Sequence, residues 1–233
     1  MFIGRENELR EMNRLFYTEK FQLFVLYGRR RVGKTTLLME FCKDKPAIFF
    51  SAENSTNSMN LRKFSQQVFA HFNEAVLESF SSWENAFLYI ENRSRDNSLA
   101  VIIDEFPYLA ESDRSLLSVL QHLIDHRLKD SRLFLVLCGS YMGFMEREVL
   151  GNKSPIFGRR TAQLHLKALD YYTGRGLLGF ASAEEQLMYY GIFGGIPMYL
   201  NRISPDEGLA GNLKHNYFST TGYLYEEPGL LLQ

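Results

Sequence analysis

The sequence predicts an α/β fold, in which a mainly parallel sheet flanked by helices is followed by a small helical lid. Apolar runs alternate with segments of helical period, a glycine-rich loop joins the first apolar run to a helix, and the pattern becomes wholly helical after Leu169. Such alternation is typical of parallel sheets, because the crossover between two parallel strands is usually a helix. We therefore expect a core domain at residues 1–168 and a lid at 169–233.

The expected strands are short apolar runs, and the expected helices carry apolar residues three and four positions apart. The strands are 21–27, 47–50, 99–103, 133–138 and 162–166. The helices are 6–16, 36–43, 61–92, 116–128, 183–190, 197–202 and 207–218. Within 61–92 the predicted core positions are Phe64, Val68, Phe72, Leu77, Phe87 and Ile90.

Composition narrows the class of protein. The chain has 233 residues, 45% of them hydrophobic, and a net charge of −1, so no global basic field points to nucleic acid or to an anionic membrane. Its apolar runs are far shorter than the roughly 20 residues of a membrane-spanning helix, and its N-terminus lacks a signal-peptide pattern. Cys42 and Cys138 lie in apolar segments and are expected to be buried free thiols. We expect a cytoplasmic protein without membrane contact.

The loop after the first strand reads Gly-Arg-Arg-Arg-Val-Gly-Lys-Thr, a Gly-x-x-x-x-Gly-Lys-Thr phosphate-binding pattern. Its glycines let backbone N–H groups point at phosphate oxygens, and the next helix adds its positive end. Lys34 is expected to reach the β- and γ-phosphates, and the Thr35 hydroxyl to hold Mg²⁺. The expected nucleotide contacts are Gly28, Arg29, Arg30, Arg31, Val32, Gly33, Lys34, Thr35 and Thr36. The pattern predicts binding of a nucleoside triphosphate.

The apolar strand 99–103 ends in two acids, Asp104 and Glu105, which is the Walker B arrangement of ATP-hydrolysing phosphate-loop proteins. Asp104 is expected to bind Mg²⁺ through water. Glu105 lies where a carboxylate can orient and polarise the attacking water. The alternative is a pair of solvated acids at a strand end.

Two arginines, Arg159 and Arg160, precede the strand 162–166. An arginine there can stabilise charge on a transferring phosphoryl group, in its own subunit or in a neighbour within a homo-oligomer. Plain surface charge is an equally good explanation. We prefer Arg159 slightly over Arg160.

Several motifs, in the same order along the chain, resemble those of the archaeal and bacterial AAA-type ATPases. These belong to the additional-strand phosphate-loop class and are related to signalling and origin-recognition ATPases. Besides the phosphate loop, the motifs are Phe2-Ile3-Gly4-Arg5-Glu6, Ile103-Asp104-Glu105-Phe106, Gly139-Ser140, Gly158-Arg159-Arg160 and Gly194-Gly195-Ile196-Pro197-Met198-Tyr199-Leu200. The resemblance implies a phosphate-loop NTPase sheet in the order 5-1-4-3-2 and, as ligands, ATP or ADP with Mg²⁺.

The resemblance also implies roles for single residues. Ser140 takes the place of sensor 1, although an ordinary Gly-Ser turn remains an alternative. Ile3 and Gly4 are expected to line the adenine side of the site, and Pro197 to contact adenine from the lid, unless its turn only joins two helices. A lid arginine of the sensor 2 type is missing from its motif, and Arg202 is the nearest candidate.

Family members usually continue into a winged-helix and a nuclease-like region, which we expect this chain to lack. DNA contact, if any, is then expected only through that missing region. We expect the apolar tail from Leu224 on to be poorly packed, or paired with a neighbouring molecule.

Two functions remain open. The favoured one is a Mg²⁺-dependent ATPase, with Glu105, Lys34, Ser140 and Arg159 in catalysis, whose nucleotide state moves the lid or a partner. The alternative is a slow nucleotide-gated signalling switch with negligible turnover. Glu105 favours the first, whereas the missing sensor 2 arginine favours the second. A small-molecule phosphotransferase is disfavoured, because the residues after Leu169 offer only scattered arginines.

Overall fold

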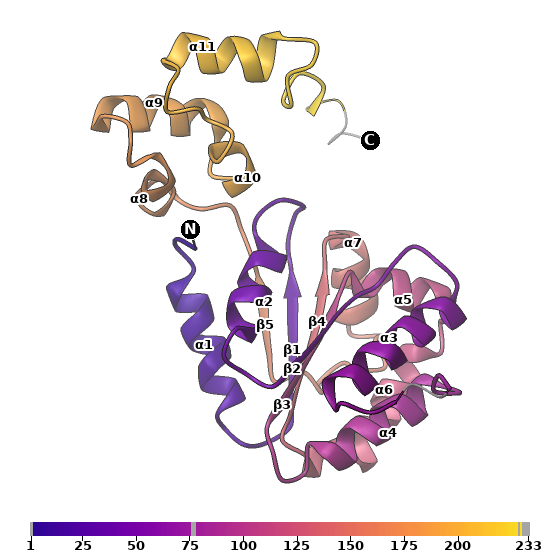
Figure 1. Cartoon of the computed structure of the whole chain (residues 1–233). Coiled ribbons are helices and arrows are strands. Elements are labelled where there is room, and N and C mark those ends of the chain that lie inside the picture. Colours follow the sequence, from indigo (N-terminus) through magenta and orange to yellow (C-terminus); the bar gives the residue numbers. More distant parts are fainter. Residues whose placement is uncertain (1, 76–77, 228, 230–233) are drawn as a thin grey trace. The chain divides into compact units, whose positions relative to one another are not determined.

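The computed structural model describes residues 2–75, 78–227 and 229 (Figure 1). The described residues form two compact units. The sheet unit comprises Arg5–Arg30 and Lys34–Leu166, and the helical unit comprises the described residues of Met1–Gly4, Arg31–Gly33 and Lys167–Gln233. The tip of the glycine-rich loop thus groups with the C-terminal helices. The domains expected at 1–168 and 169–233 stay a prediction, because compactness alone does not establish independent folding.

Within the described residues, parallel strands form a five-stranded sheet. They are β1 (Gln22–Tyr27), β2 (Ala47–Ser51), β3 (Leu99–Asp104), β4 (Leu133–Gly139) and β5 (Ala162–His165). The spatial order β2-β3-β4-β1-β5 confirms the order expected from the resemblance. Every residue of β1, β3 and β4 is buried, which explains why these strands are continuous apolar runs without polar alternation.

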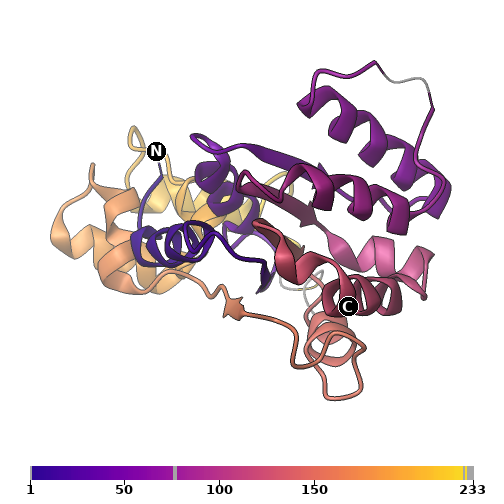
Figure 2. The ribbon, with the colours of Figure 1, turned by 90° about the horizontal axis from the view of Figure 1, so that it is seen from below.

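Helices cover both faces of this sheet (Figures 1 and 2). One face is covered by α1 (Glu6–Phe16) and α2 (Lys34–Cys42); the other by α3 (Asn57–His71), α4 (Trp83–Arg93), α5 (Phe106–Ser112) and α6 (Leu116–His126). On the first face the rings of Phe16, Phe41 and Phe134 pack with centroids 5.3 to 6.2 Å apart. On the second, Leu23 and Val25 of β1 join the larger apolar cluster. Alternate residues of one strand thus enter two cores.

The stretch 61–92, expected to be one helix, is two helices. The Thr56 hydroxyl caps α3 by accepting the Met59 N–H at 3.3 Å, and the Ser82 hydroxyl caps α4 by accepting the Asn85 N–H at 3.1 Å. The helical spacing of apolar residues continues across this break, so the periodicity alone missed the cap at Ser82. Of the predicted core residues, Phe64, Val68, Phe87 and Ile90 are buried, Phe72 is partly buried and Leu77 lies outside the described residues.

Short elements that the sequence did not predict lie beside the ends of β3 and β4. They are α5, the three-residue helix α7 (Met142–Phe144) and a π-helical turn at Met145–Val149. A 3-10 turn at Leu128–Asp130 follows α6. Both cysteines are free, as expected, but only Cys138 is fully buried, whereas Cys42 is half-buried. Among the described helices, none has the length and apolar character needed to cross a bilayer.

The helical unit contains α8 (Tyr171–Gly174), a 3-10 turn at Arg175–Leu178, α9 (Ala183–Phe193), α10 (Pro197–Leu200) and α11 (Leu209–Leu213), which a π-helical turn at Lys214–Phe218 extends. Leu178, Tyr189 and Phe193 lie in its apolar core. Leu224 packs in the same core and is 2% exposed, so the expectation of a poorly packed tail is wrong at this residue. Pro228 and residues 230–233 of that tail lie outside the described residues.

Candidate nucleotide site

The predicted catalytic groups of the sheet unit other than Arg159 gather at one edge of the sheet, because the carboxyl ends of parallel strands meet there. β1 ends at Tyr27 and leads into the glycine-rich loop, β3 ends at Asp104, and β4 ends at Gly139. Tyr27 lies opposite Gly139 in the register of β1 and β4. This arrangement brings Lys34, Thr35, Asp104, Glu105 and Ser140 to the same edge.

Two glycines of the loop occupy positions that other residues would not. A Cβ on Gly28 would lie 2.3 Å from the Leu166 carbonyl oxygen, so the backbone approach to the chain after β5 requires glycine. Gly33 has φ +96°, a conformation that L side chains rarely adopt. The backbone therefore favours glycine at both positions of the phosphate-binding pattern, independently of any bound phosphate.

Lys34 begins α2 and points its ammonium back at the loop. Its Nζ donates hydrogen bonds to the carbonyl oxygens of Gly28 at 2.8 Å and Arg29 at 2.9 Å. The side chain is buried, and this burial lowers the pKa of its ammonium. A desolvated cation that donates to neutral carbonyls is well suited to take an anionic partner.

Thr35 and Asp104 form the candidate metal pair. The Thr35 hydroxyl donates to Asp104 Oδ2 at 2.8 Å, and Asp104 Oδ1 accepts the Glu105 backbone N–H at 3.0 Å. Asp104 is 3% exposed. A hydroxyl and a carboxylate oxygen are the hard donors that Mg²⁺ prefers, so the two residues fit this ion.

Glu105 and Ser140 form a second pair. The Ser140 hydroxyl lies 2.9 Å from each carboxylate oxygen of Glu105 and donates to them. Glu105 has φ +51°, a left-handed conformation unusual for a residue with a side chain, and it is the residue from which α5 begins. The sequence placed these residues separately and did not predict their contact, although both follow neighbouring strands.

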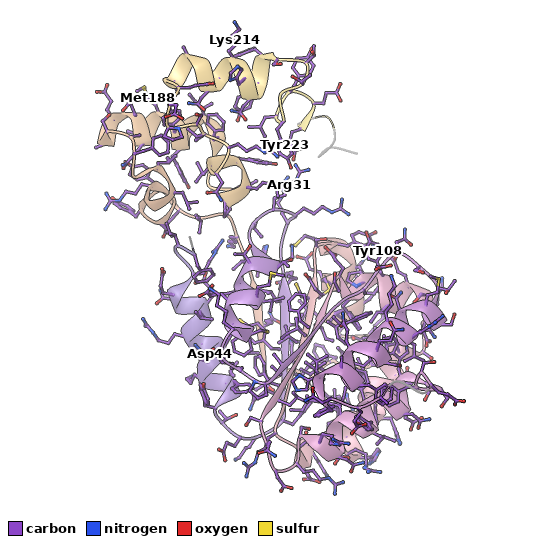
Figure 3. All side chains as sticks on the ribbon, viewed as in Figure 1. Arg31, Asp44, Tyr108, Met188, Lys214 and Tyr223 are labelled. Atoms are coloured by element: carbon purple, nitrogen blue, oxygen red, sulfur yellow. The ribbon has the colours of Figure 1, made fainter. Side chains whose placement is uncertain are left out.

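The arginines of the loop lie in different surroundings. Arg29 and Arg30 are exposed, as is Thr36, whereas Val32 is buried. Arg31, in the helical unit, has φ +73° and forms an ion pair with Glu227, and its guanidinium lies 4.9 Å from the ring centroid of Tyr223 (Figure 3). The ion pair joins residues 196 positions apart, so no local pattern could reveal it.

Ile3, Gly4 and Pro197 belong to the helical unit. A Cβ on Gly4 would lie 1.9 Å from the Thr173 Cγ2 atom, so this N-terminal turn packs tightly on α8. Pro197 is in the first turn of α10, after Gly194 has ended α9 with φ +69°. The turn thus joins two helices, and the adenine roles of these residues stay predictions. Arg202 lies 3.7 Å above the ring of Tyr223.

Arg159 lies near the amino ends of the strands, at the end of the sheet opposite the phosphate loop. Thr161, two residues later, donates its N–H to the Leu23 carbonyl near the start of β1, far along the strand from the phosphate loop. The Arg159 guanidinium forms two hydrogen bonds of 2.7 Å with the carboxylate of Asp125 in α6. Arg160 lies over the ring of Phe157. The structure therefore does not bring Arg159 together with the residues at the phosphate-loop edge of its own chain.

Comparisons with known proteins identify the family. The profile of a family described as an ATPase domain predominantly from Archaea matches residues 2–203. An uncharacterised protein of Methanocaldococcus jannaschii is 32% identical over 204 residues, which cover 87% of this chain and 44% of that protein. The chain therefore spans less than half the length of this curated relative.

Solved structures show the same fold. A Walker-type ATPase of Pyrococcus abyssi has a TM-score of 0.65 and 21% identity, covering 86% of this chain and 66% of its own. The Orc1 protein of Aeropyrum pernix, in complex with DNA, has a TM-score of 0.60 and 16% identity, covering 87% of this chain and 59% of its own. At these identities the likeness concerns the fold alone.

Proposed function

We propose that this chain, which belongs to the family of ATPase domains predominantly from Archaea, binds ATP with Mg²⁺ and hydrolyses its terminal phosphoanhydride bond. The observation that carries the proposal is the pairing of Ser140 with Glu105, at the edge where Thr35 also contacts Asp104. One pair supplies oxygen donors for a metal ion, and the other supplies an oriented carboxylate. Together they support hydrolysis, beyond the binding that the phosphate loop alone implies.

Phosphate binding is assigned to Lys34 and the loop around it. Its ammonium is held by the carbonyls of Gly28 and Arg29. Exchanging these neutral acceptors for phosphate oxygens pairs the ammonium with anionic acceptors and gives stronger hydrogen bonds. Thr35 and Asp104 would hold Mg²⁺, which supplies neutralisation of phosphate charge when it is bound.

Water activation is assigned to Glu105. A carboxylate orients and polarises an attacking water only if its own position is fixed, and both of its oxygens accept from Ser140. The left-handed conformation of Glu105 costs of the order of 1 kcal/mol or more, and strain of this kind gathers at functional sites. Geometry and strain thus support the same role.

Arg159 is proposed to act in a neighbouring subunit of a homo-oligomer. Its position at the far edge of its own sheet favours this over a role in its own site. We propose little sequence-specific DNA binding by residues 1–233, because a net charge of −1 gives little release of counterions from DNA. The movement of a lid or partner with the nucleotide state is also a proposal.

Glu105→Gln tests the hydrolytic role, since it keeps the size of the side chain and removes its charge. ATP binding, measured by calorimetry, should persist, while multiple-turnover phosphate release should fall by about 10²–10⁴-fold. Glu184→Gln, the same change at an exposed position of α9, is the matched control and should retain the parental rate. Lys34→Ala should abolish tight binding.

Two outcomes of this experiment would reject the proposal. A Glu105→Gln rate within twofold of the parent would remove Glu105 from water activation. Tight ATP binding by the parent with less than one turnover would support the signalling switch instead.

A further inference from the structure

A pocket of about 630 Å³ lies in the sheet unit, beside the residues assigned to water activation. Its lining includes Glu111 and Arg114 near the end of α5, and Tyr141, Phe144, Arg147 and Glu148 after β4. Its volume falls within the range of roughly 300–1,000 Å³ that is usual for ligand sites. The proposed ATPase mechanism uses none of these six side chains.

The charges of this pocket are balanced and unpaired. Glu111, Arg114, Arg147 and Glu148 are all exposed. In the part of the chain that the structure describes, none of the four forms an ion pair, and Arg147 donates only to the Gly143 carbonyl at 3.1 Å. Two carboxylates and two guanidinium groups around one hollow suit a ligand that carries both signs of charge.

Aromatic surface lies between these charges. Tyr141 is 53% exposed although its ring is large, and Phe144 lies deeper, at 9%. Exposed aromatic rings near arginines are typical of surfaces that bind protein segments. The two glutamates disfavour a nucleotide or a nucleic acid here, because phosphate oxygens would be brought against carboxylates.

The segments that line the pocket directly follow Glu105 and Ser140 along the chain. α5 begins directly after Glu105, and Tyr141 directly follows Ser140. The two walls also meet above the end of β4, where a Cβ on Gly139 would lie 2.6 Å from Met145 Sδ and 2.9 Å from Pro107 Cδ. A ligand that shifts either wall therefore changes the position of Glu105 or of Ser140.

We propose that this pocket binds a peptide segment of a partner protein, in which an apolar side chain is flanked by one basic and one acidic side chain. Occupancy of the pocket alters the rate of ATP hydrolysis through the Glu105–Ser140 contact, and this second statement rests on the proposed function. The apolar side chain packs on Tyr141 and Phe144, and the flanking charges meet the carboxylates and guanidinium groups.

Three heptapeptides with a central leucine test the binding. In the mixed peptide a lysine flanks the leucine on one side and a glutamate flanks it on the other. In the second peptide both flanking residues are lysines, and in the third both are glutamates. Amide chemical shifts of the ¹⁵N-labelled protein at Tyr141 and Gly143 report occupancy. The mixed peptide should bind about 1.5- to 5-fold more tightly than either other peptide, as expected for an exposed ion pair gained. Equal affinities, or no binding, would overturn the proposal.

A charge swap separates recognition from misfolding. Arg114→Glu should turn the preference toward the peptide with two lysines, a gain that a damaged protein cannot show. Arg10→Glu, the same change at an exposed position of α1, should keep the preference for the mixed peptide. An unchanged preference in Arg114→Glu would count against the pocket as the binding site. Self-association of the protein that displaces the peptide would also count against it.

The two parts of the proposal fail separately. The mixed peptide should still bind Glu105→Gln, so binding remains measurable even if the protein does not hydrolyse ATP. In an active parent, the saturating peptide should change kcat at least twofold while leaving the KM for ATP unchanged. Peptide binding without any change in kcat would overturn the coupling to hydrolysis.

Discussion

Replacing Ser140 by alanine removes the hydroxyl that holds the Glu105 carboxylate at 2.9 Å. Within the described residues no other side chain donates to this carboxylate. A hydrogen bond to a charged group contributes about 1.5–3 kcal/mol. If that energy orients Glu105 in the transition state, the loss corresponds to about 10- to 160-fold in rate, at 1.36 kcal/mol for each factor of ten.

The assay is steady-state release of phosphate at saturating ATP, together with ATP affinity measured by calorimetry. The affinity of Ser140→Ala should match the parent, because Ser140 makes no hydrogen bond to the phosphate loop. Ser140→Thr keeps a hydroxyl and should lie within about threefold of the parent, which makes it the control for packing.

Three results would refute this reasoning. A rate for Ser140→Ala within twofold of the parent would mean that the hydrogen bond does not orient Glu105. A rate above the parent would mean that Ser140 restrains Glu105 in an unproductive position. Equal losses in Ser140→Ala and Ser140→Thr would point to packing instead of the hydroxyl.

Three further outcomes are expected. Arg159→Ala should bind ATP without hydrolysing it, and mixing it with Glu105→Gln should restore part of the rate; no recovery in a demonstrated mixed oligomer would count against action between subunits. Glu105→Gly should unfold in denaturant no more easily than Glu105→Gln, because glycine adopts φ +51° without strain, and a clearly weaker glycine variant would contradict that strain. Asn212 is buried and donates to the Ser204 and Glu207 carbonyls, so Asn212→Ala should destabilise the helical unit by about 1–3 kcal/mol. Amide exchange in α9 and α11 should quicken, and unchanged exchange there would reject this role.

The sheet was predictable from the sequence because its signals are local. Buried parallel strands are continuous apolar runs, and the strands 99–103 and 133–138 were each predicted to within one residue of β3 and β4. Their spatial order came from the family resemblance, since short apolar runs carry no information about which neighbour they pair with.

The parts that the sequence missed depend on short or distant features. α5 and α7 are too short to show a helical period, and Glu105 begins α5 from a left-handed conformation that no residue pattern announces. The sequence therefore did not predict the pocket beside these two helices. The ion pair of Arg31 with Glu227 depends on tertiary structure alone. By contrast, the phosphate-loop pattern predicted roles for Lys34 and Thr35 directly, because its spacing is set by one local turn, and these roles stay predictions.

The position of β4 between β1 and β3 has a consequence for the spacing of Thr35 and Asp104, the two proposed metal ligands. Neighbouring strands lie about 4.8 Å apart, so the backbones of β1 and β3 are separated by roughly 9.6 Å. The 2.8 Å contact between Thr35 and Asp104 bridges this separation through the first turn of α2 and the two side chains. Because all seven residues of β4 are buried, that strand acts as a spacer whose width is set by core packing. Insertions in surface loops therefore leave the distance between the two ligands unchanged. A one-residue deletion within β4 would instead turn its side chains to the opposite face of the sheet and disturb both ligands at once.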